Sequence, residues 1–399
     1  MDNREEREVL LKVEHLCQYF KSGSFELKAV DDVSFDIKKG EVFGLVGESG
    51  CGKTTTGRSI IKLYNATSGN VFFKGRRICA GLRSYKEELK AERKKLRSPD
   101  ADKEAIEARI AALKEEIKKA KKDQKDCDKM YKEARVHELT EERDQKLSSA
   151  SESEKEAITA EYAEKIKRAK RENLVTKIQM IFQDPIASLN PRMTVREIVS
   201  EGLIIQGEKD KKYIQDEVYK VLELVSLVPE HADRYPHEFS GGQRQRIGIA
   251  RSIIMKPDLI IADEPVSALD VSIQAQVINL LNDLRSQLGL TILFIAHDLS
   301  VVKYFSDRIG VMYFGKMVEL ASSDELFKHP LHPYTRSLLS AIPLPDPHYE
   351  KKRKRITYNP LAEHDYSQEQ PTFREVCPGH FVRCNTAEFE RYQEMLKNE

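Results

Sequence analysis

The sequence has little of what would place it outside the cell or within a membrane. Its 399 residues include six scattered cysteines, which suggest no disulfide framework and fit a reducing compartment. No apolar run approaches the ~18 residues that a membrane-spanning helix needs, and the mostly charged first eight residues do not resemble a secretory signal. We therefore expect a soluble, intracellular chain that reaches a membrane only through partners.

A surplus of charge of either sign is also lacking. The 66 Lys and Arg residues are nearly balanced by 65 Asp and Glu residues, so the formal net charge is +1. Such a balance creates no global field that would attract nucleic acid, and we expect no nucleic-acid partner. The length allows two or three domains.

One stretch fits the phosphate-binding P-loop pattern G-x-x-x-x-G-K-[ST]. It consists of Gly47, Glu48, Ser49, Gly50, Cys51, Gly52, Lys53 and Thr54, followed by Thr55. The apolar run at 41–46 predicts a buried strand before it, and residues 55–63 predict a helix after it. A helix N-terminus with free N–H groups attracts anions, Lys53 adds a positive charge, and the Thr54 hydroxyl can ligate magnesium. This context favours a nucleotide site over a simple glycine-rich turn.

Four further motifs follow in order. Gln183 comes after an apolar run at 178–182, and Ser240, Gly241, Gly242 and Gln243 open a helix that runs towards residue 254. Apolar strands at 259–262 and 290–296 end in Asp263 with Glu264 and in His297, respectively. Each motif alone has a structural explanation: strand-end capping, a tight helix entry, or a structural histidine. Their order behind a P-loop favours one shared functional site.

The region before the P-loop carries β-type runs at 9–13 and 29–35, which predict an antiparallel sheet beside the nucleotide strand. Tyr19 and Phe20 lie in this region, where an aromatic ring can stack on an adenine base. We choose Phe20 for that role. Ordinary packing of strand aromatics in a core is an equally good interpretation.

The composition changes after Gly81. More than half of residues 81–172 are charged, with one proline, Pro99, so the segment is either a long solvated helix system or disordered. A 4-3-4-3 spacing of apolar residues favours helices and predicts a coiled-coil seam. The seam consists of Ile106, Ile110, Leu113, Ile117 and Ala120, continued more weakly by Gln124, Cys127, Tyr131 and Ala134. A second stripe, expected to be the returning partner helix, consists of Ile158, Tyr162, Ile166 and Ala169.

We interpret this segment as an inserted coiled-coil arm. Breaks are expected near 98–100 and 148–153, and a helix over 106–134 would be ~43 Å long, enough to project from the globular body. Such an arm should pack mainly on itself. We therefore expect that replacing residues 82–171 with a short Gly/Ser linker leaves a folded, nucleotide-binding chain.

Taken together, the motifs resemble the ATP-binding-cassette ATPases over nearly the whole chain except the arm. The resemblance implies an α/β fold with a parallel core sheet, an antiparallel β subdomain and a helical subdomain. It implies that Glu264 is the general base, with His297 as the switch histidine and residues 267–270 as the D-loop. It further implies ATP with Mg²⁺ held by Thr54, Asp263 and Gln183, the Q-loop residue. Residues 240–243, the signature, would contact ATP bound by another cassette.

A narrower resemblance covers shorter stretches. Residues 179–192 and 329–343 resemble the oligopeptide/dipeptide importer branch, and residues 377–382 resemble the F-type ATP-binding subunit of Gram-positive oligopeptide permeases. This implies a peripheral protein at the cytoplasmic face of the cell membrane. Its implied partners are a second, non-identical cassette subunit, two transmembrane permease subunits and an extracellular peptide-binding protein.

Some members of that branch carry an iron–sulfur cluster on the C-terminal tail. Here the tail has only Cys377 and Cys384, short of the four thiolates that a cluster needs, so we expect none. The basic run at 351–355 is interpreted as a solvated tail.

The resulting organisation is a discontinuous cassette at 1–80 and 173–320, the helical insertion at 81–172, and a C-terminal importer extension at 321–399. The alternative function is a coiled-coil-bearing cassette ATPase of chromosome maintenance or DNA repair. Two features argue against it: the arm precedes Gln183, whereas those ATPases insert theirs after the Q-loop, and it is short by their standards. Salt-sensitive DNA binding would favour the alternative.

Overall fold

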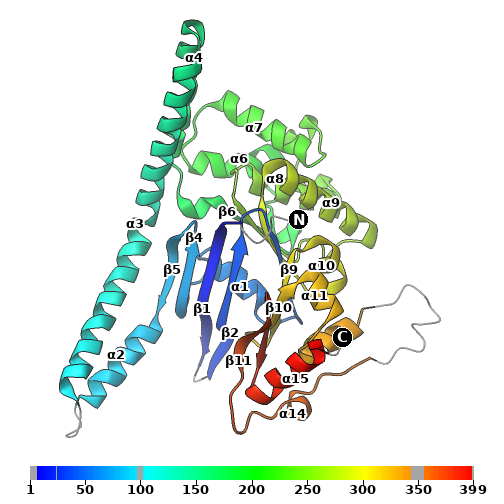
Figure 1. The fold of residues 1–399 in the computed structure, drawn as a ribbon. Helices are drawn as coiled ribbons and strands as arrows, with labels where there is room; N and C mark the ends of the chain where they lie inside the picture. The colour runs from blue at the N-terminus through cyan, green and yellow to red at the C-terminus, as the bar shows by residue number, and fades with distance from the viewer. Residues whose placement is uncertain (1–6, 24, 97–101, 343–354, 398–399) are drawn as a thin grey trace.

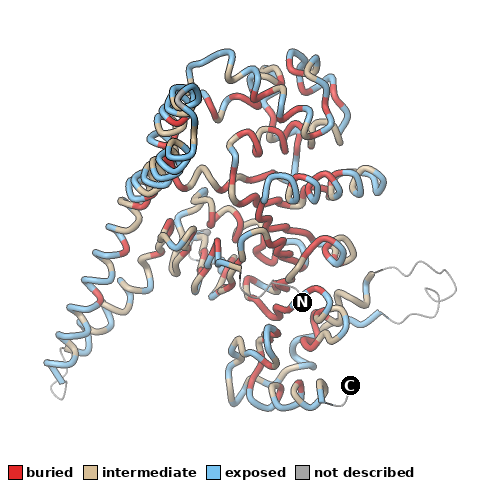
Figure 2. Tube along the Cα trace, turned by 45° about the horizontal axis from the view of Figure 1, so that its top comes forward, coloured by how far each residue is buried: buried red, intermediate tan, exposed pale blue. Residues whose placement is uncertain are grey.

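The computed structural model describes residues 7–23, 25–96, 102–342 and 355–397. The expected break at 98–100 and nearly all of the basic run at 351–355 lie outside these residues. Two sheets form the body of the molecule (Figure 1), and buried residues concentrate in and around them (Figure 2). No helix in the described ranges is long and apolar enough to cross a bilayer.

The larger sheet has eight strands in the order β11-β12-β10-β9-β3-β8-β7-β6. Five of them are parallel: β6 (Ile178–Ile181), β7 (Leu259–Asp263), β8 (Thr291–Ala296), β3 (Val42–Val46) and β9 (Arg308–Tyr313). The strands β3, β7 and β8 are buried along their whole length, as expected for parallel strands covered on both faces. Their carboxyl ends lie at one edge of the sheet, which is where the sequence motifs end.

The smaller sheet is antiparallel, in the order β2-β1-β4-β5. Its strands are β1 (Val9–Ser22), β2 (Phe25–Lys38), β4 (Ser68–Phe73) and β5 (Arg76–Leu82). It packs with the parallel sheet around one apolar core, in which the rings of Phe35 and Phe43 stack 5.0 Å apart. The predicted α/β cassette with an antiparallel sheet beside the nucleotide strand is therefore confirmed.

The segment of the chain between β6 and β7 is mostly helical. Its helices are α5 (Pro185–Ser188), α6 (Val195–Ile205), α7 (Lys211–Leu224) and α8 (Gly241–Ile253), and α9 (Val271–Leu288) and α10 (Leu299–Phe305) follow β7 and β8. Local capping sets where several of them begin: the Thr194 hydroxyl accepts the Glu197 N–H, and the Glu197 carboxylate accepts the Thr194 N–H. These helices share a second apolar core with one face of the parallel sheet.

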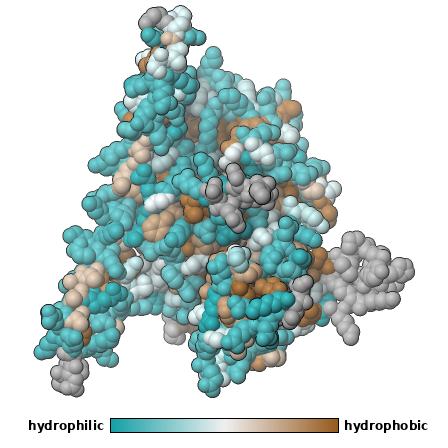
Figure 3. Space-filling model, viewed as in Figure 1, coloured by the Kyte–Doolittle hydropathy of each residue, from teal (hydrophilic) through white to brown (hydrophobic). Residues whose placement is uncertain are grey.

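The charged segment forms three helices: α2 (Arg83–Lys95), α3 (Lys103–Ser149) and α4 (Glu152–Ala169). The helix α3 is longer than expected, 47 residues or ~70 Å, and the break near residue 150 is confirmed. The arm has a mostly hydrophilic surface and reaches past the body at both ends (Figures 1 and 3). We use the name arm for residues 83–169 from here on.

The predicted coiled coil is not confirmed in the expected register, although α4 does return along α3 and packs against it. The stripe on α4 packs against Val136 and Leu139, beyond the predicted seam, because the chain reverses only after Ser149. The seam packs against α2 at its start. Further along α3 it packs against β5 and the 3-10 helix η1 (Leu174–Lys177). Tyr131, at the end of the seam, is 6% exposed and belongs to the apolar core of the cassette.

Polar contacts join the arm to two parts of the cassette. On the sheet side, the Asp128 carboxylate accepts the Leu174 N–H at 2.8 Å, and the Gln124 amide donates to the Ala80 carbonyl at 3.4 Å. On the helical side, Arg168 pairs with Glu208 at 3.1 Å and its guanidinium lies 3.6 Å from the Tyr213 ring centroid. The arm therefore covers the edge strand β5 and braces it against the segment between α6 and α7.

The C-terminal extension continues the larger sheet. After β10 (Lys316–Ser322) come α11 (Ser323–Lys328), α12 (Pro333–Ser340), α14 (Pro360–Glu363), the hairpin β11 (Thr372–Cys377) and β12 (His380–Cys384), and α15 (Thr386–Lys397). Strand β12 pairs with β10 through Glu319 and Val382. The extension thus shares a sheet with the cassette and has a small apolar core of its own.

Candidate functional site

The P-loop lies between β3 and α1 (Lys53–Ile60), as the sequence predicts. Gly47 and Gly52 adopt positive φ angles of 150° and 107°. A Cβ atom at Gly47 would lie 2.2 Å from the Met312 carbonyl oxygen, and one at Gly52 would lie 2.2 Å from the Ala29 carbonyl oxygen. Only glycine fits either position, because the obstructing atoms belong to the backbone.

The loop has a buried base and an open rim. The Lys53 side chain is buried, and its ammonium donates to the Gly47 carbonyl at 2.7 Å and the Glu48 carbonyl at 2.9 Å. Residues 48–50 at the rim are exposed, whereas Cys51 and Gly52 are buried and Thr54 and Thr55 are half-buried at the start of α1. This is a cradle that is open on the side where a phosphate chain would enter.

Thr54 and Asp263 lie together at the base of the cradle. The Thr54 hydroxyl donates to Asp263 Oδ1 at 2.7 Å. Asp263 is fully buried, and its other carboxylate oxygen has no hydrogen-bond partner among the described residues. Burial raises the pKa of this carboxyl group. A buried carboxylate oxygen without a partner, beside a hydroxyl, fits a hard divalent cation that takes oxygen ligands.

Glu264, Gln183 and His297 form a second group at the same sheet edge. The Gln183 amide donates to Glu264 Oε2 at 3.0 Å, and His297 Nδ1 lies 3.3 Å from the same oxygen. Glu264 has a positive φ of 44°, a strained conformation for a residue with a side chain. Its N–H bonds to the Ile295 carbonyl at 2.9 Å, which holds it at the end of β8.

The expected site residues therefore fall into two adjoining groups. Gln183 pairs with Glu264 here, and its predicted role as a magnesium ligand beside Thr54 and Asp263 stays a prediction.

A cavity of about 70 Å³ adjoins Glu264 and His297. It has room for two or three water molecules.

The signature residues lie at the exposed start of α8. Ser240 caps this helix: its hydroxyl accepts the Gln243 N–H at 3.3 Å, and the Gln243 side chain accepts the Ser240 N–H at 3.0 Å. A Cβ atom at Gly242 would lie 2.6 Å from Ile273 Cγ2, so α9 requires a glycine there. Within the described ranges, no hydrogen bond joins residues 240–243 to the P-loop of the same chain.

Phe20 lies near the end of β1, half-buried, with its ring 5.2 Å from that of Tyr64 in an edge-on contact. Tyr64 follows α1, so the ring lies beside the helix that the P-loop opens. Its predicted contact with adenine stays a prediction.

Sequence reasoning missed Tyr334, which links the C-terminal extension to the P-loop. Its hydroxyl accepts the Glu48 N–H at 3.0 Å, although 286 positions separate the two residues. His332 places it: burial lowers the pKa of His332 to about 3, so the imidazole is neutral and its Nδ1 accepts the Tyr334 N–H at 3.1 Å. This bond caps α12, and Pro333 occupies the first position of the helix. The His-Pro-Tyr run was the available signal.

We expect Tyr334→Phe to weaken ATP binding by ~2- to 10-fold, because the Glu48 N–H loses its partner while the ring packing stays. Tyr358→Phe is the matched control, since that ring packs 5.5 Å from Tyr334 but makes no hydrogen bond to the described P-loop residues. Equilibrium binding of a fluorescent ATP analogue would measure both variants. Equal affinities for Tyr334→Phe and wild type would contradict a role for this contact.

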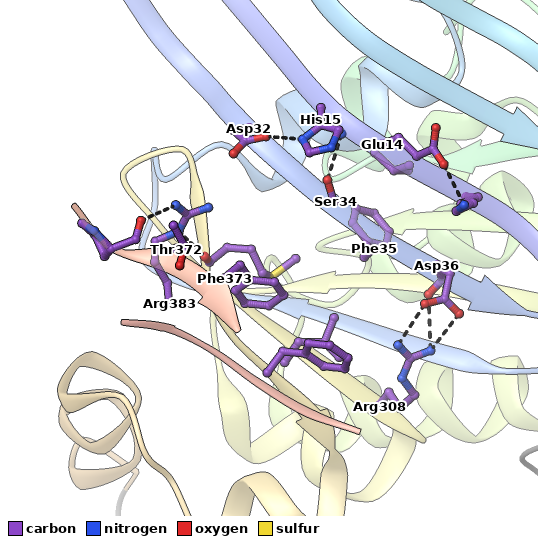
Figure 4. A pocket seen from close by; sticks show the side chains of 16 residues that line it. Glu14, His15, Asp32, Ser34, Phe35, Asp36, Arg308, Thr372, Phe373 and Arg383 are labelled. Carbon is purple, nitrogen blue, oxygen red and sulfur yellow. Dashed lines mark hydrogen bonds and ion pairs between the residues drawn. The ribbon is translucent and has the colours of Figure 1, made fainter. Parts of the chain in front are cut away.

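A larger cavity lies elsewhere. Its volume is about 750 Å³, between β1 and β2 on one side and the C-terminal hairpin on the other (Figure 4). Glu14 and His15 line one wall, Phe373 and Arg383 the opposite wall, and Arg308 reaches Asp36 beneath them. None of the P-loop residues, the two acids Asp263 and Glu264 or the signature residues 240–243 lines it, so we assign it no part in nucleotide binding.

Comparisons with known protein families match most of the chain. The family described as "ABC transporter" matches residues 30–159 and 145–267, and the family described as "Oligopeptide/dipeptide transporter, C-terminal region" matches residues 318–384. The chain is 49% identical over 386 residues to the oligopeptide transport ATP-binding protein OppF of Bacillus subtilis, covering 96% of this chain and 99% of the relative.

Other relatives agree. The chain is 42% identical to the oligopeptide transport ATP-binding protein AmiF of Streptococcus pneumoniae, covering 98% of this chain and 99% of the relative. It is 43% identical to the dipeptide transport ATP-binding protein DppF of Lactococcus lactis, covering 92% and 90%. All are transport proteins, which gives no support to the chromosome-maintenance alternative.

Solved structures support the fold. A dimeric structure of the ATP-binding cassette MJ0796 bound to ADP and phosphate has a TM-score of 0.51 at 22% identity, covering 79% of this chain and 99% of that one. The CbiO1 component of an ABC transporter from Clostridium perfringens also has a TM-score of 0.51, at 21% identity, covering 81% and 92%. The chain belongs to the ABC transporter family and, within it, to the oligopeptide and dipeptide transport ATP-binding proteins.

Proposed function

We propose that this chain is the ATP-binding subunit of an oligopeptide importer and that it hydrolyses ATP to drive peptide uptake. One observation carries the proposal: the P-loop, the acids that end β7 and the histidine that ends β8 meet at one edge of the parallel sheet, although they are far apart in sequence. Membership of the oligopeptide transport family supplies the substrate class.

Nucleotide would bind along the open rim of the P-loop. The N–H groups at the start of α1 and the Lys53 ammonium would hold the phosphates, with Phe20 placed for the base. Thr54 and Asp263 would hold Mg²⁺, and the Asp263 oxygen without a partner supports this assignment. Gln183 would join them once its bond to Glu264 is released. Magnesium neutralises phosphate charge when bound.

Glu264 is our candidate for the general base. Its carboxylate lies beside a cavity that has room for two or three water molecules, and it can accept a proton from the attacking water. His297 also lies beside that carboxylate. Its ring is exposed, so it can donate a hydrogen bond to the terminal phosphate. Until Gln183 moves to the metal, its amide holds the Glu264 carboxylate in place.

A second cassette would complete the site. Ser240, Gly241 and Gly242 are exposed or half-exposed, and the start of α8 offers N–H groups to a phosphate that lies outside this chain. We propose that the partner is a similar but non-identical cassette subunit. We also propose two transmembrane permease subunits, which would hold the chain peripherally at the cytoplasmic face of the membrane, and an extracellular peptide-binding protein.

We expect Ser240→Arg to spare ATP binding by this chain but reduce hydrolysis at the partner's site, because the bulky side chain blocks the start of α8. Single-turnover hydrolysis in the assembled transporter, with binding measured separately on each cassette, tests this. The matched control is Ser226→Arg, at an exposed position outside the signature. An isolated monomer that hydrolyses ATP at a concentration-independent, undiminished specific activity would contradict the shared site.

The function itself is tested by affinity purification of the chain from solubilised membranes of the producing cell. We expect two hydrophobic permease chains and a second cassette to co-purify. The purified assembly should couple ATP hydrolysis to oligopeptide uptake in vesicles. Co-purification with DNA and no membrane chain would overturn the proposal.

A further inference from the structure

A tight turn in the C-terminal hairpin brings a thiol and an imidazole together. Cys377 and His380 are paired across the ladder of β11 and β12, with Pro378 and Gly379 between them. Gly379 has a φ of 78°, and a proline followed by such a glycine is typical of a type II turn. Directly paired residues project their side chains on the same face of a hairpin. Two ligands separated by two residues are a common chelating unit for zinc.

A carboxylate from another element joins them. Glu325 lies on α11, and its carboxylate, the Cys377 sulfur and a ring nitrogen of His380 all lie within 4.8 Å of one another. His380 Nδ1 is 3.4 Å from Glu325 Oε1. A tetrahedral zinc ion with its ligands at ~2.0–2.3 Å requires ligand atoms less than ~4 Å apart, so only small side-chain shifts are needed.

The ring of His380 is held in the orientation that a metal ligand needs. Its other nitrogen, Nε2, lies 2.8 Å from Glu319 Oε1, and both side chains are fully buried. The same carboxylate accepts the N–H groups of Leu331 at 2.8 Å and His332 at 3.1 Å, so it is fixed as an acceptor. A carboxylate that accepts one ring N–H leaves the other nitrogen free to bind a metal, and this arrangement accompanies most metal-bound histidines.

The group is accessible. Glu325 and Cys377 line a cavity of about 560 Å³, together with Pro378 and Gly379. An ion can therefore enter without unfolding of the hairpin, and a water molecule can occupy a fourth position. His329 lies on the other side of Glu325, with Nδ1 3.1 Å from the same carboxylate oxygen, and would orient it.

We propose that Cys377, His380 and Glu325 form a mononuclear zinc site that ties the C-terminal hairpin to α11. One thiolate, one imidazole and one carboxylate favour Zn²⁺ over magnesium or calcium, which take oxygen ligands only. An iron–sulfur cluster requires more thiolates than the single one that the described residues place here. The zinc site is separate from the candidate nucleotide site, and the proposal does not depend on the proposed transport function.

The test uses the full-length, untagged chain, stripped with a chelator and kept free of nucleotide. Titration with Zn²⁺ against a chromophoric chelator should show one equivalent bound. Both Cys377→Ser and Glu325→Gln should weaken that binding by at least ~10- to 100-fold. Cys384→Ser, which removes a thiol from the same hairpin but outside the group, should bind like wild type.

Cobalt provides a spectroscopic readout of thiolate coordination, in addition to the measured affinities. Co²⁺ bound to wild type should give a thiolate-to-metal charge-transfer band in the near ultraviolet, absent in Cys377→Ser. Zinc should also raise the unfolding temperature of wild type and leave that of Glu325→Gln nearly unchanged. Less than half an equivalent of zinc on wild type, a cobalt spectrum without the thiolate band, or equal affinity in Glu325→Gln would overturn the site.

Discussion

Glu264→Gln is expected to bind ATP with near-normal affinity and to hydrolyse it at least ~10²-fold more slowly within the assembled transporter. The amide keeps the size of the side chain and its contact with Gln183, which lies 3.0 Å away, but cannot take a proton from water. Lys53→Ala should behave in the opposite way and weaken binding itself, because it removes a charged phosphate contact. Steady-state phosphate release and equilibrium ATP binding separate the two effects.

The control for charge is Glu223→Gln, at an exposed carboxylate on α7 outside the nucleotide site. It should leave both quantities unchanged. Normal turnover by Glu264→Gln in the assembled complex would show that another group takes the proton.

Replacing residues 82–171 with a Gly/Ser linker should destabilise the chain, contrary to the expectation from sequence. The excision removes Tyr131 from the cassette core and uncovers the edge of β5. Loss of a buried aromatic side chain alone costs ~3–5 kcal/mol. We expect an insoluble product or a fall in the unfolding temperature of at least ~10 °C. Thermal unfolding with and without Mg-ATP measures the fall in the unfolding temperature.

The matched control removes only the tip of the arm. Replacing residues 144–157 with a short loop shortens α3 and α4 but keeps Leu139, Tyr162 and every contact with β5. This variant should unfold within a few degrees of wild type and keep its stabilisation by ATP. Full excision with an unchanged unfolding temperature would restore the interpretation of the arm as a self-contained addition.

The place of the candidate nucleotide site could be predicted from sequence because its chemistry requires particular residues at fixed spacings. Only glycine fits at Gly47 and Gly52, and a strand that ends in Asp263 and Glu264 leaves few alternatives. The parallel strands could also be predicted, since fully buried strands give continuous apolar runs. The contact between Gln183 and Glu264 could not be predicted, because a side-chain contact between distant segments leaves no local sequence pattern.

The arm shows where periodicity fails. The spacing from Ile106 to Tyr131 correctly marks the buried face of α3, since Leu113, Ala120, Cys127 and Tyr131 are buried. The same spacing does not say what covers that face, because a sheet edge and a second helix both accept an apolar stripe. The contact that Tyr334 makes could not be predicted for a similar reason, although the His-Pro-Tyr run marked its position. A hydroxyl that bonds a loop 286 positions away requires the whole fold.

The arm also has a mechanical consequence. A stiff helix of ~70 Å that contacts β5 near its middle would act as a lever that turns about the sheet. Because Arg168 on α4 pairs with Glu208 and Arg171, just beyond α4, bonds to Gly207, a rotation of the helical region relative to the sheet would turn or bend α3. A turn of ~10° moves a tip ~30 Å away by ~5 Å, a displacement well above thermal motion. Spin labels or dyes at the tip and on the sheet would therefore report small movements of the cassette as readily measured changes in distance.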